Sequence, residues 1–212
     1  EVVAINDLTD AENLLHLLKY DSVHGRLTAD AELKDGSLHV AGQTIRMTAE
    51  RDPAKLPWGD VDVAYECTGF FTTRDAAAKH LENGSKRVLI SAPGKGVDRT
   101  VVYGVNHQDL TAEDVIVSNA SCTTNCLAPV AKVLDDTFGI ETGYMTTIHA
   151  YTGDQPTHDS PHRDPYRGRA AALSMVPTST GAAAAISEVI PHLKGVLEGS
   201  AVRVPTANVS LV

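Results

Sequence analysis

Short apolar runs rich in β-branched residues alternate with helical segments along the first 121 residues, and this alternation constrains the fold most strongly. Residues 1–6 form one such run, and residues 61–67 and 86–91 form two more on either side of a helical segment at 73–81. Strands that alternate with helices form parallel sheets, because each helix returns the chain to the same end of the sheet. Residues 1–121 are therefore predicted to form most of a doubly wound, Rossmann-type α/β sheet.

Two details modify this pattern. Residues 31–49 contain three short apolar runs separated by Asp35-Gly36 and Ala41-Gly42, which predicts an antiparallel insertion made of hairpins. Before the insertion, Thr9 is followed three residues later by Glu12, which is the spacing of a capping box. We therefore expect a helix that begins at Thr9.

After residue 121 the pattern becomes that of part of an α+β domain, so we expect two domains, residues 1–121 and 122–212. The stretch 151–168 has no hydrophobic period, and loops longer than about 12–15 residues in compact domains are usually functional or disordered. The expected regular elements are helices at 123–138 and 181–190 and strands at 142–150 and 201–212.

Composition excludes several classes of protein. The 212 residues carry a formal net charge of −9, which disfavours binding to nucleic acid. No apolar run approaches the roughly 20 residues that span a membrane, so no membrane partner is expected. Cys67, Cys122 and Cys126 are too few for a disulfide framework, which favours a reducing, cytoplasmic location. No paired cysteine and histidine spacing suggests zinc, and no metal site is expected.

Both ends of the sequence run into apolar segments. Glu1 leads directly into Val2, and the last residues, 208–212, stop inside an expected strand. Domain ends are more often polar. We therefore expect a piece of a longer protein, whose first domain lacks its first strand and glycine loop and whose second domain is truncated at its C-terminal side.

Cys122 lies where an apolar strand passes directly into a helix, in the segment Ser118–Pro129. The N-terminus of a helix carries about half a positive charge and free N–H groups, and both favour a thiolate. The alternative is a small cysteine packed under the helix, but polar neighbours such as Ser121 and Thr123 argue against an apolar pocket. Cys122 is thus a candidate nucleophile, whereas Cys126, one turn later, fits a structural role.

A nucleophilic cysteine usually needs a base, and nine histidines compete for that role. His149 lies near the end of an expected strand, just before the long loop, and sites in α/β folds gather at such strand ends. Spacing alone does not favour His149 over His158 or His162.

Polar side chains suited to anions occur along the second domain. The guanidinium group of arginine matches phosphate and carboxylate geometry, and the start of a helix also binds anions. Ordinary arginine–carboxylate pairing on the surface is the alternative. The candidates are Thr152, Asp154, Arg167, Arg169, Thr180, Gly181 and Arg203.

Asp7 ends the first strand of the chain. In a dinucleotide-binding fold, an acidic residue at the end of the second strand binds the ribose hydroxyls of the cofactor. An aspartate in an ordinary turn is the alternative interpretation.

The sequence resembles the phosphorylating glyceraldehyde-3-phosphate dehydrogenases, in particular bacterial and plastid-like forms, over essentially its whole length. The block Ser-Asn-Ala-Ser-Cys-Thr-Thr-Asn is highly specific for this family. The matching segments are Val3–Leu8, Leu17–Gly25, Ala49–Pro53, Ser118–Pro129, Thr147–Gln155, Pro177–Ala183 and Val202–Thr206.

The resemblance implies an enzyme of glycolysis and gluconeogenesis that oxidises glyceraldehyde 3-phosphate with NAD and inorganic phosphate to 1,3-bisphosphoglycerate through a cysteine thioester. It implies that Cys122 is the nucleophile and His149 the base. The implied residues for the sugar phosphate and inorganic phosphate are Ser121, Thr123, Thr152, Arg167, Thr180, Gly181 and Arg203. Those implied for the dinucleotide are Asp7, Arg51, Thr68, Gly69 and Ser91.

The resemblance also implies a homotetramer of the full-length protein, in which the loop at about 151–173 packs against a neighbouring subunit. Ser160-Pro161 stands where the family often has Leu-Pro, so NADP stays open as a cofactor, although Asp7 favours NAD by opposing a 2′-phosphate. Two alternative functions remain: an erythrose-4-phosphate dehydrogenase, against which Thr152 argues, and a truncated binding protein without catalysis.

Overall fold

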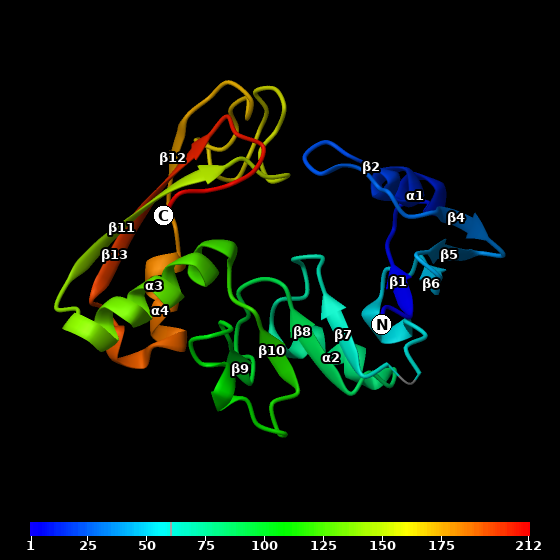
Figure 1. The fold of residues 1–212 in the computed structure, drawn as a ribbon, viewed down its shortest axis with the longest axis horizontal. Coiled ribbons are helices and arrows are strands. Elements are labelled where there is room, and N and C mark those ends of the chain that lie inside the picture. The colour runs from blue at the N-terminus through cyan, green and yellow to red at the C-terminus, as the bar shows by residue number, and fades with distance from the viewer. Residues whose placement is uncertain (60) are drawn as a thin grey trace. The chain divides into compact units, whose positions relative to one another are not determined.

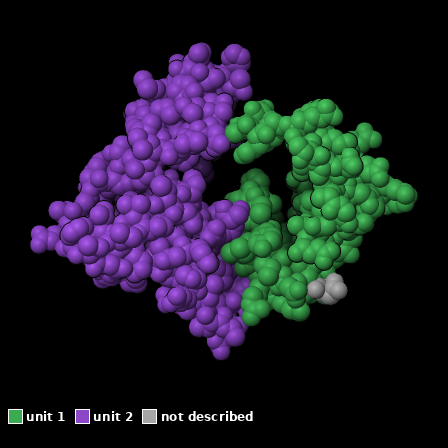
Figure 2. Space-filling model, viewed as in Figure 1, with its two compact units in different colours: residues 1–89 green, residues 90–212 purple. Residues whose placement is uncertain are grey.

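The computed structural model describes residues 1–59 and 61–212, which divide into two compact units, residues 1–89 and 90–212 (Figure 2). Each unit has its own set of buried residues. The predicted division into domains 1–121 and 122–212 is a different division and stays a prediction.

The first unit begins with a sheet in the order β1-β6-β5-β4. Strand β1 (Ala4–Asn6) pairs in parallel with β6 (Gln43–Thr48), and β5 (Ser37–Val40) lies antiparallel to both β6 and β4 (Ala31–Lys34). The turns at Asp35-Gly36 and Ala41-Gly42 have positive φ at both residues, as two-residue hairpins of this kind require. The predicted antiparallel insertion is therefore confirmed.

Helix α1 (Ala11–Lys19) begins one residue later than predicted, because Asp10 and not Thr9 is its N-cap. The Asp10 carboxylate accepts the N–H of Asn13 at 2.9 Å. The N–H of Thr9 instead donates to the carboxylate of Asp7 at 2.8 Å, which forms a turn before the helix. Two aspartates thus displace the expected threonine cap. Short strands β2 (Tyr20–Asp21) and β3 (Gly25–Arg26) follow.

The rest of the first unit contains the predicted strand–helix–strand segment. Strand β7 (Val63–Glu66) is followed by helix α2 (Arg74–Glu82) and strand β8 (Arg87–Ile90). The short helix η1 (Pro53–Lys55) precedes β7. A small core of Leu56, Trp58 and Ala64 lies beneath these elements, and Ala4 and Val61 pack against it.

The second unit starts with strands β9 (Arg99–Thr100) and β10 (Ile116–Ser118), which pair in parallel; the short helix η2 (His107–Asp109) lies between them in sequence. Strand β10 leads into helix α3 (Cys122–Phe138), which ends at Gly139 as predicted.

A second sheet, in the order β11-β13-β12, forms the rest of this unit. Strand β11 (Gly143–Ala150) lies parallel to β13 (Leu197–Val204), which is antiparallel to β12 (Val176–Thr178). Helix α4 (Ala182–Val189) packs beside α3 against this sheet, and the short helix η3 (Pro191–Leu193) follows it (Figure 1).

The predicted strand at 201–212 is wrong in its bounds, since β13 begins at Leu197 and ends at Val204. Pro205 follows, and a proline has no N–H to donate to a strand ladder. Beyond it, Leu211 forms an isolated antiparallel bridge with Ile148.

The stretch between β11 and β12 is a long loop, as predicted, and the structure describes all of it without a helix or strand. Among the described residues, no helix is long and apolar enough to cross a membrane.

Candidate active site

The turn between β10 and α3 places Cys122 at the first position of the helix. Ser121 is the N-cap, and its hydroxyl accepts the N–H of Thr124 at 3.1 Å. Cys122 is solvent-exposed. The free N–H groups of the first helical turn surround the cysteine with partial positive charge, which is the environment expected from the sequence.

This turn is held in an unusual backbone conformation. Ala120 has φ of 56°, which for a residue with a Cβ atom costs roughly 1–2 kcal/mol. Hydrogen bonds on both sides enforce it. The Ser118 hydroxyl accepts the N–H of Ala120 at 3.1 Å, and the Asn125 side-chain amide donates to the carbonyls of Asn119 at 2.7 Å and Ser121 at 2.9 Å. Strain held in place in this way is typical of functional sites.

Asn125 is a residue that the sequence analysis did not single out. The signal was present, because an amide side chain in the first turn of a helix can reach back to the carbonyls before it. Nothing in hydrophobic spacing reveals such a contact.

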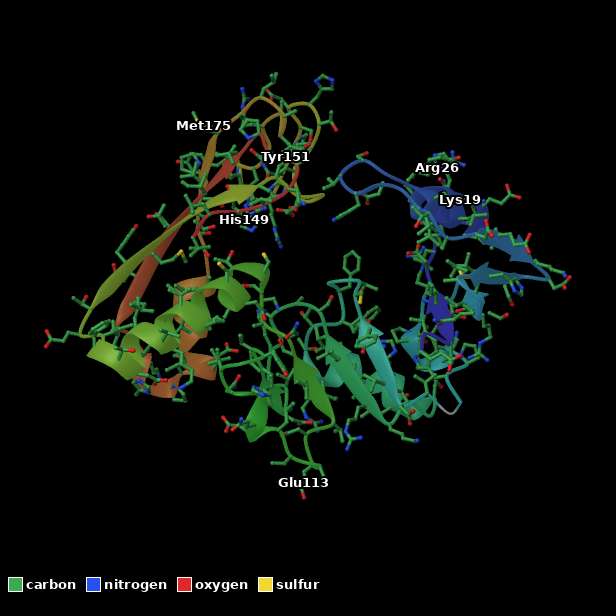
Figure 3. The ribbon with its side chains drawn as sticks, in the orientation of Figure 1. Lys19, Arg26, Glu113, His149, Tyr151 and Met175 are labelled. Atoms are coloured by element: carbon green, nitrogen blue, oxygen red, sulfur yellow. The ribbon has the colours of Figure 1, made fainter. Side chains whose placement is uncertain are left out.

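The sulfur of Cys122 lies 3.3 Å from Nε2 of His149. His149 is buried at the end of β11 that leads into the long loop (Figure 3). Of the three histidines left open by spacing, His149 is the one that lies on β11 and, among the described residues, the one in contact with Cys122.

A second hydrogen bond fixes which ring nitrogen of His149 faces the cysteine. Nδ1 lies 2.7 Å from the carbonyl oxygen of Ala150, which can only accept, so Nδ1 carries a proton. In the neutral ring, the lone pair of Nε2 therefore points at the thiol of Cys122. This arrangement suits removal of the thiol proton.

Arg203 lies beside His149, because the two residues are paired in the β11–β13 register. Its Nη1 donates to the carbonyl of Ala150 at 3.0 Å and to the hydroxyl of Thr152 at 3.4 Å. The strand pairing thus brings Arg203 to His149 and Thr152, from which it is separated by more than 50 residues in sequence.

Burial lowers the pKa of Arg203, and the positive charge of Arg167 lowers it further, whereas Cys122 and Asp154 act in the opposite direction. An anion that binds between two guanidinium groups relieves their mutual repulsion and is itself stabilised by both charges. The electrostatics around Cys122 therefore fit an anionic ligand.

Arg167 already has carboxylate partners. Its Nη1 lies 2.9 Å from Oδ2 of Asp154, and its Nε lies 3.0 Å from the hydroxyl of Thr178 and 3.6 Å from Asp164. The bond from Arg167 holds the pKa of Asp154 below its ordinary range. For Arg167 the structure thus contains the arginine–carboxylate pairing that the sequence left as the alternative to anion binding.

The remaining phosphate candidates lie at two helix starts of the second unit. Thr123 is buried, with its hydroxyl 4.0 Å from the Cys122 sulfur. Thr180 and Gly181 directly precede α4, where the Thr180 hydroxyl accepts the N–H of Ala182 at 3.2 Å. The hydroxyl of Ser121 is engaged in capping α3 and also contacts the hydroxyl of Thr124 at 2.7 Å.

Four of the predicted dinucleotide residues lie in the first unit. Asp7 follows β1 directly and is exposed, and its N–H donates to the carbonyl of Thr48 at 3.0 Å. The neighbouring Asn6 donates to the carbonyl of Glu50 at 2.9 Å, so the end of β1 is tied to the segment that carries Arg51. Arg51 lines an open cavity of about 380 Å³ together with Phe71.

The other two, Thr68 and Gly69, form an exposed turn after β7. Gly69 has φ of 75°, a conformation in which a side chain is disfavoured. The N–H of Phe70 donates to the Thr68 hydroxyl at 3.1 Å, which closes the turn. Ser91, the fifth predicted dinucleotide residue, follows β8, is exposed and belongs to the second unit.

All three cysteines are free thiols. Within residues 1–59 and 61–212, no group of three or more histidine, cysteine or acidic side chains is arranged to hold a metal ion.

Two protein-family models match this chain. The model of the glyceraldehyde 3-phosphate dehydrogenase NAD binding domain matches residues 1–74, and that of the C-terminal domain of the same family matches residues 121–212.

Individual relatives agree along the whole chain. The glyceraldehyde-3-phosphate dehydrogenase of Cereibacter sphaeroides is 64% identical over 212 residues, that of Xanthobacter flavus is 61% identical over 214, and glyceraldehyde-3-phosphate dehydrogenase 1 of Bacillus subtilis is 61% identical over 216. Each alignment covers 100% of this chain and 64% of the relative, so the chain spans just under two thirds of their length.

Proposed function

Because the chain belongs to the glyceraldehyde-3-phosphate dehydrogenase family, we propose that it carries the reacting cysteine of an enzyme that oxidises glyceraldehyde 3-phosphate with inorganic phosphate to 1,3-bisphosphoglycerate. NAD is the cofactor of the family domain that matches residues 1–74. The observation that carries the proposal is the 3.3 Å contact between the Cys122 sulfur and Nε2 of His149.

The first step is attack of Cys122 on the aldehyde. Nε2 of His149 takes the thiol proton, and the thiolate forms a bond to the carbonyl carbon. The proton then passes from the imidazolium to the new alkoxide, which gives a hemithioacetal with a neutral hydroxyl group. The hydrogen bond from Nδ1 of His149 to the Ala150 carbonyl stabilises the imidazolium during this exchange.

Oxidation converts the hemithioacetal into a thioester on Cys122. NAD supplies a hydride acceptor when bound. His149 takes the hydroxyl proton again as the hydride leaves the same carbon, so that a carbonyl group forms. The partly positive start of α3 stabilises the charge that develops on the substrate oxygen.

Inorganic phosphate then attacks the thioester carbon, and Cys122 leaves as a thiolate with an acyl phosphate as product. Support for phosphate binding comes from the mutual repulsion of Arg167 and Arg203 and from the hydroxyl of Thr152 beside Arg203. Arg203 and Thr152 are proposed to hold the sugar phosphate. The proposed donors to the attacking phosphate, beside Arg167, are Ser121, Thr123, Thr180 and Gly181.

Three features of the first unit support binding of a dinucleotide. An open cavity of about 380 Å³ lies at Arg51 and Phe71, where the ring of Phe71 offers an apolar face. The exposed carboxylate of Asp7 can accept two ribose hydroxyl groups and repels a 2′-phosphate, which supports NAD over NADP. Thr68 and Gly69 complete the proposed contacts in this unit, and the dinucleotide contact of Ser91 in the second unit stays a prediction.

The proposal extends to a cytoplasmic homotetramer of the full-length protein. The long loop exposes large side chains, with Tyr166 66%, Leu173 83% and Met175 74% exposed, and their exposure supports packing against another subunit. The free thiols of Cys67, Cys122 and Cys126 support a reducing compartment.

The test is to trap the thioester. The chain is incubated with NAD and glyceraldehyde 3-phosphate without inorganic phosphate, and peptides are mapped by mass spectrometry. The proposal expects an acyl adduct on the Cys122 peptide that disappears when phosphate is added.

Two other outcomes separate the alternative functions. A faster adduct with erythrose 4-phosphate as substrate would favour the related sugar-phosphate dehydrogenase. NAD binding without any adduct would favour a binding protein without catalysis.

A further inference from the structure

A chain of buried hydrogen bonds runs through the first unit to the proposed cofactor turn. Nε1–H of Trp58 donates to Nδ1 of His80 at 3.0 Å, and Nε2 of His80 lies 2.9 Å from Oε2 of Glu66. The side chains of His80 and Glu66 are only 5% and 2% exposed. The rings of Trp58 and His80 are stacked with centroids 6.2 Å apart.

The hydrogen bonds fix where the proton of His80 lies. The indole of Trp58 can only donate, so Nδ1 of His80 accepts and carries no proton. Its remaining ring proton is therefore on Nε2, and this N–H donates to Glu66. His80 is thus a neutral imidazole that accepts a hydrogen bond from Trp58 and donates one to Glu66.

The other oxygen of Glu66 holds Thr68. Oε1 accepts the N–H of Thr68 at 2.8 Å and also its hydroxyl hydrogen. Burial raises the pKa of Glu66, but the bonds from His80 and Thr68 outweigh burial and bring the pKa below its ordinary value. Glu66 is therefore a carboxylate to which every observed neighbour donates.

The chain of hydrogen bonds ends on the surface rather than in the core. Thr68 and Gly69 are exposed, and Phe70, whose N–H is held by the Thr68 hydroxyl, is 86% exposed. Burying polar groups is costly, and apolar side chains of similar volume often stabilise a core as well or better. The buried polar groups therefore act on the exposed turn, because their hydrogen bonds fix its conformation.

We propose that Trp58, His80 and Glu66 are positioning residues that fix the Thr68–Gly69 turn in the conformation that receives the cofactor. This inference rests on the proposed function for the identity of the ligand, NAD. It assigns a role to three side chains that themselves lie inside the unit and need not touch the dinucleotide.

Glu66→Gln tests the proposal with almost no change of shape. Both sides of position 66 present N–H donors, so the amide NH₂ group of Gln meets a donor in either orientation. With its oxygen toward Thr68, the NH₂ faces the N–H of His80; in the flipped orientation it faces the N–H of Thr68. We expect the Kd for NAD to rise about fivefold to tenfold, the effect of one lost buried hydrogen bond.

Trp58→Phe in the Glu66→Gln background is the sharper variant. Without the indole N–H, His80 can move its proton to Nδ1, and its Nε2 can then accept from the NH₂ of Gln at position 66. We expect the double variant to bind NAD more tightly than Glu66→Gln alone, and to recover the slow amide exchange of Thr68. If these residues acted only through packing, the effects of the two substitutions on the free energy of NAD binding would add.

The matched control is Ser85→Ala. The Ser85 hydroxyl is also buried, accepts the N–H of Ala64 at 3.1 Å and donates to the carbonyl of Arg87 at 2.7 Å, but it has no bond to the turn. This variant should lower stability while leaving the exchange of the Thr68 amide and the Kd for NAD unchanged.

Measurements without ligand separate this proposal from the proposed function. On the full chain, ¹⁵N chemical shifts should show His80 with its proton on Nε2, and hydrogen exchange of the Thr68 amide should be faster in Glu66→Gln. A proton on Nδ1, or unchanged exchange together with an unchanged Kd, would overturn the positioning role. If the parent chain fails to bind NAD, the proposed function fails, and the exchange and rescue results still decide whether these residues position the turn.

Discussion

Two turns at strand ends carry the residues of the proposed sites, and they are fixed by different chemistry. The turn after β10, which presents Cys122, is held by the hydroxyl of Ser118 and the amide of Asn125. The turn after β7, which carries Thr68, is held by the buried carboxylate of Glu66.

The difference has a physical consequence. Hydroxyl and amide groups do not titrate, so the β10 turn keeps its geometry over a wide range of pH. When it is protonated, a carboxylate gains an O–H donor and loses part of its acceptor capacity, and Glu66 accepts from both His80 and Thr68, so the β7 turn depends on pH. The turn that presents the reacting group is thus built from neutral groups, and the turn proposed to bind the cofactor from a charged one.

The largest expected effect separates a reacting group from a binding group. Cys122→Ser should lower NADH formation from glyceraldehyde 3-phosphate by at least about 10³-fold, because loss of a nucleophile removes the covalent step. The Kd for NAD, measured by calorimetry, should stay within about twofold. Substantial turnover in this variant would refute the role proposed for Cys122.

Asn125→Ala tests whether the hydrogen bonds from the Asn125 amide to the β10 turn affect the reactivity of Cys122. The variant loses two hydrogen bonds to backbone carbonyls, each worth about 0.5–1.5 kcal/mol. We expect the rate of Cys122 alkylation by iodoacetamide to fall about tenfold relative to that of Cys67, which serves as the internal control. Equal changes at both cysteines would instead indicate general loosening of the chain.

The elements around both turns follow from sequence patterns. The alternation of apolar runs and helical spacing correctly predicted β7, α2 and β8, and the position of α3. The start of α1 was wrong because the neighbouring Thr9 and Asp10 compete for the cap: Asp10 accepts the N–H of Asn13, and the N–H of Thr9 donates to Asp7.

The contacts that organise the turns are less accessible to sequence reasoning. His149 contacts Cys122 from 27 positions further along the chain, and the choice among three histidines depends on strand pairing that spacing does not reveal. Trp58, Glu66 and His80 come from three different elements or loops and follow no common period. Buried polar networks therefore depend on tertiary contacts that no sequence pattern reveals.

Acid should affect the β7 turn selectively. The pKa of folded Glu66 lies below its ordinary value of 4.5, so the carboxylate stabilises the fold above about pH 4.5 and this contribution is lost as the pH falls through the folded pKa. Urea unfolding of the parent and of Glu66→Gln, compared from pH 7 downward, isolates this component.

The expected result is that the parent loses stability relative to Glu66→Gln as the pH drops below 4.5. The stability difference between the parent and Asn125→Ala should not change over the same range, because the amide does not titrate. A constant difference for Glu66→Gln would contradict the assignment of Glu66 as a carboxylate.

The smallest expected effect concerns the strain in the β10 turn. Ala120 has φ of 56°, and Ala120→Gly removes the clash of the Cβ atom at a cost of up to about 1 kcal/mol in unfolded-chain entropy. The Ala120 methyl is also buried in the hydrophobic cluster of the second unit, and its loss offsets the relieved strain, so we expect thermal stability to change by about 1 kcal/mol or less. Because glycine adopts this conformation without strain, Cys122 alkylation should become less sensitive to loss of Asn125, so that Ala120→Gly and Asn125→Ala together slow the reaction by less than the product of their separate effects. Simple additivity would show that Asn125 holds the turn without opposing strain at Ala120.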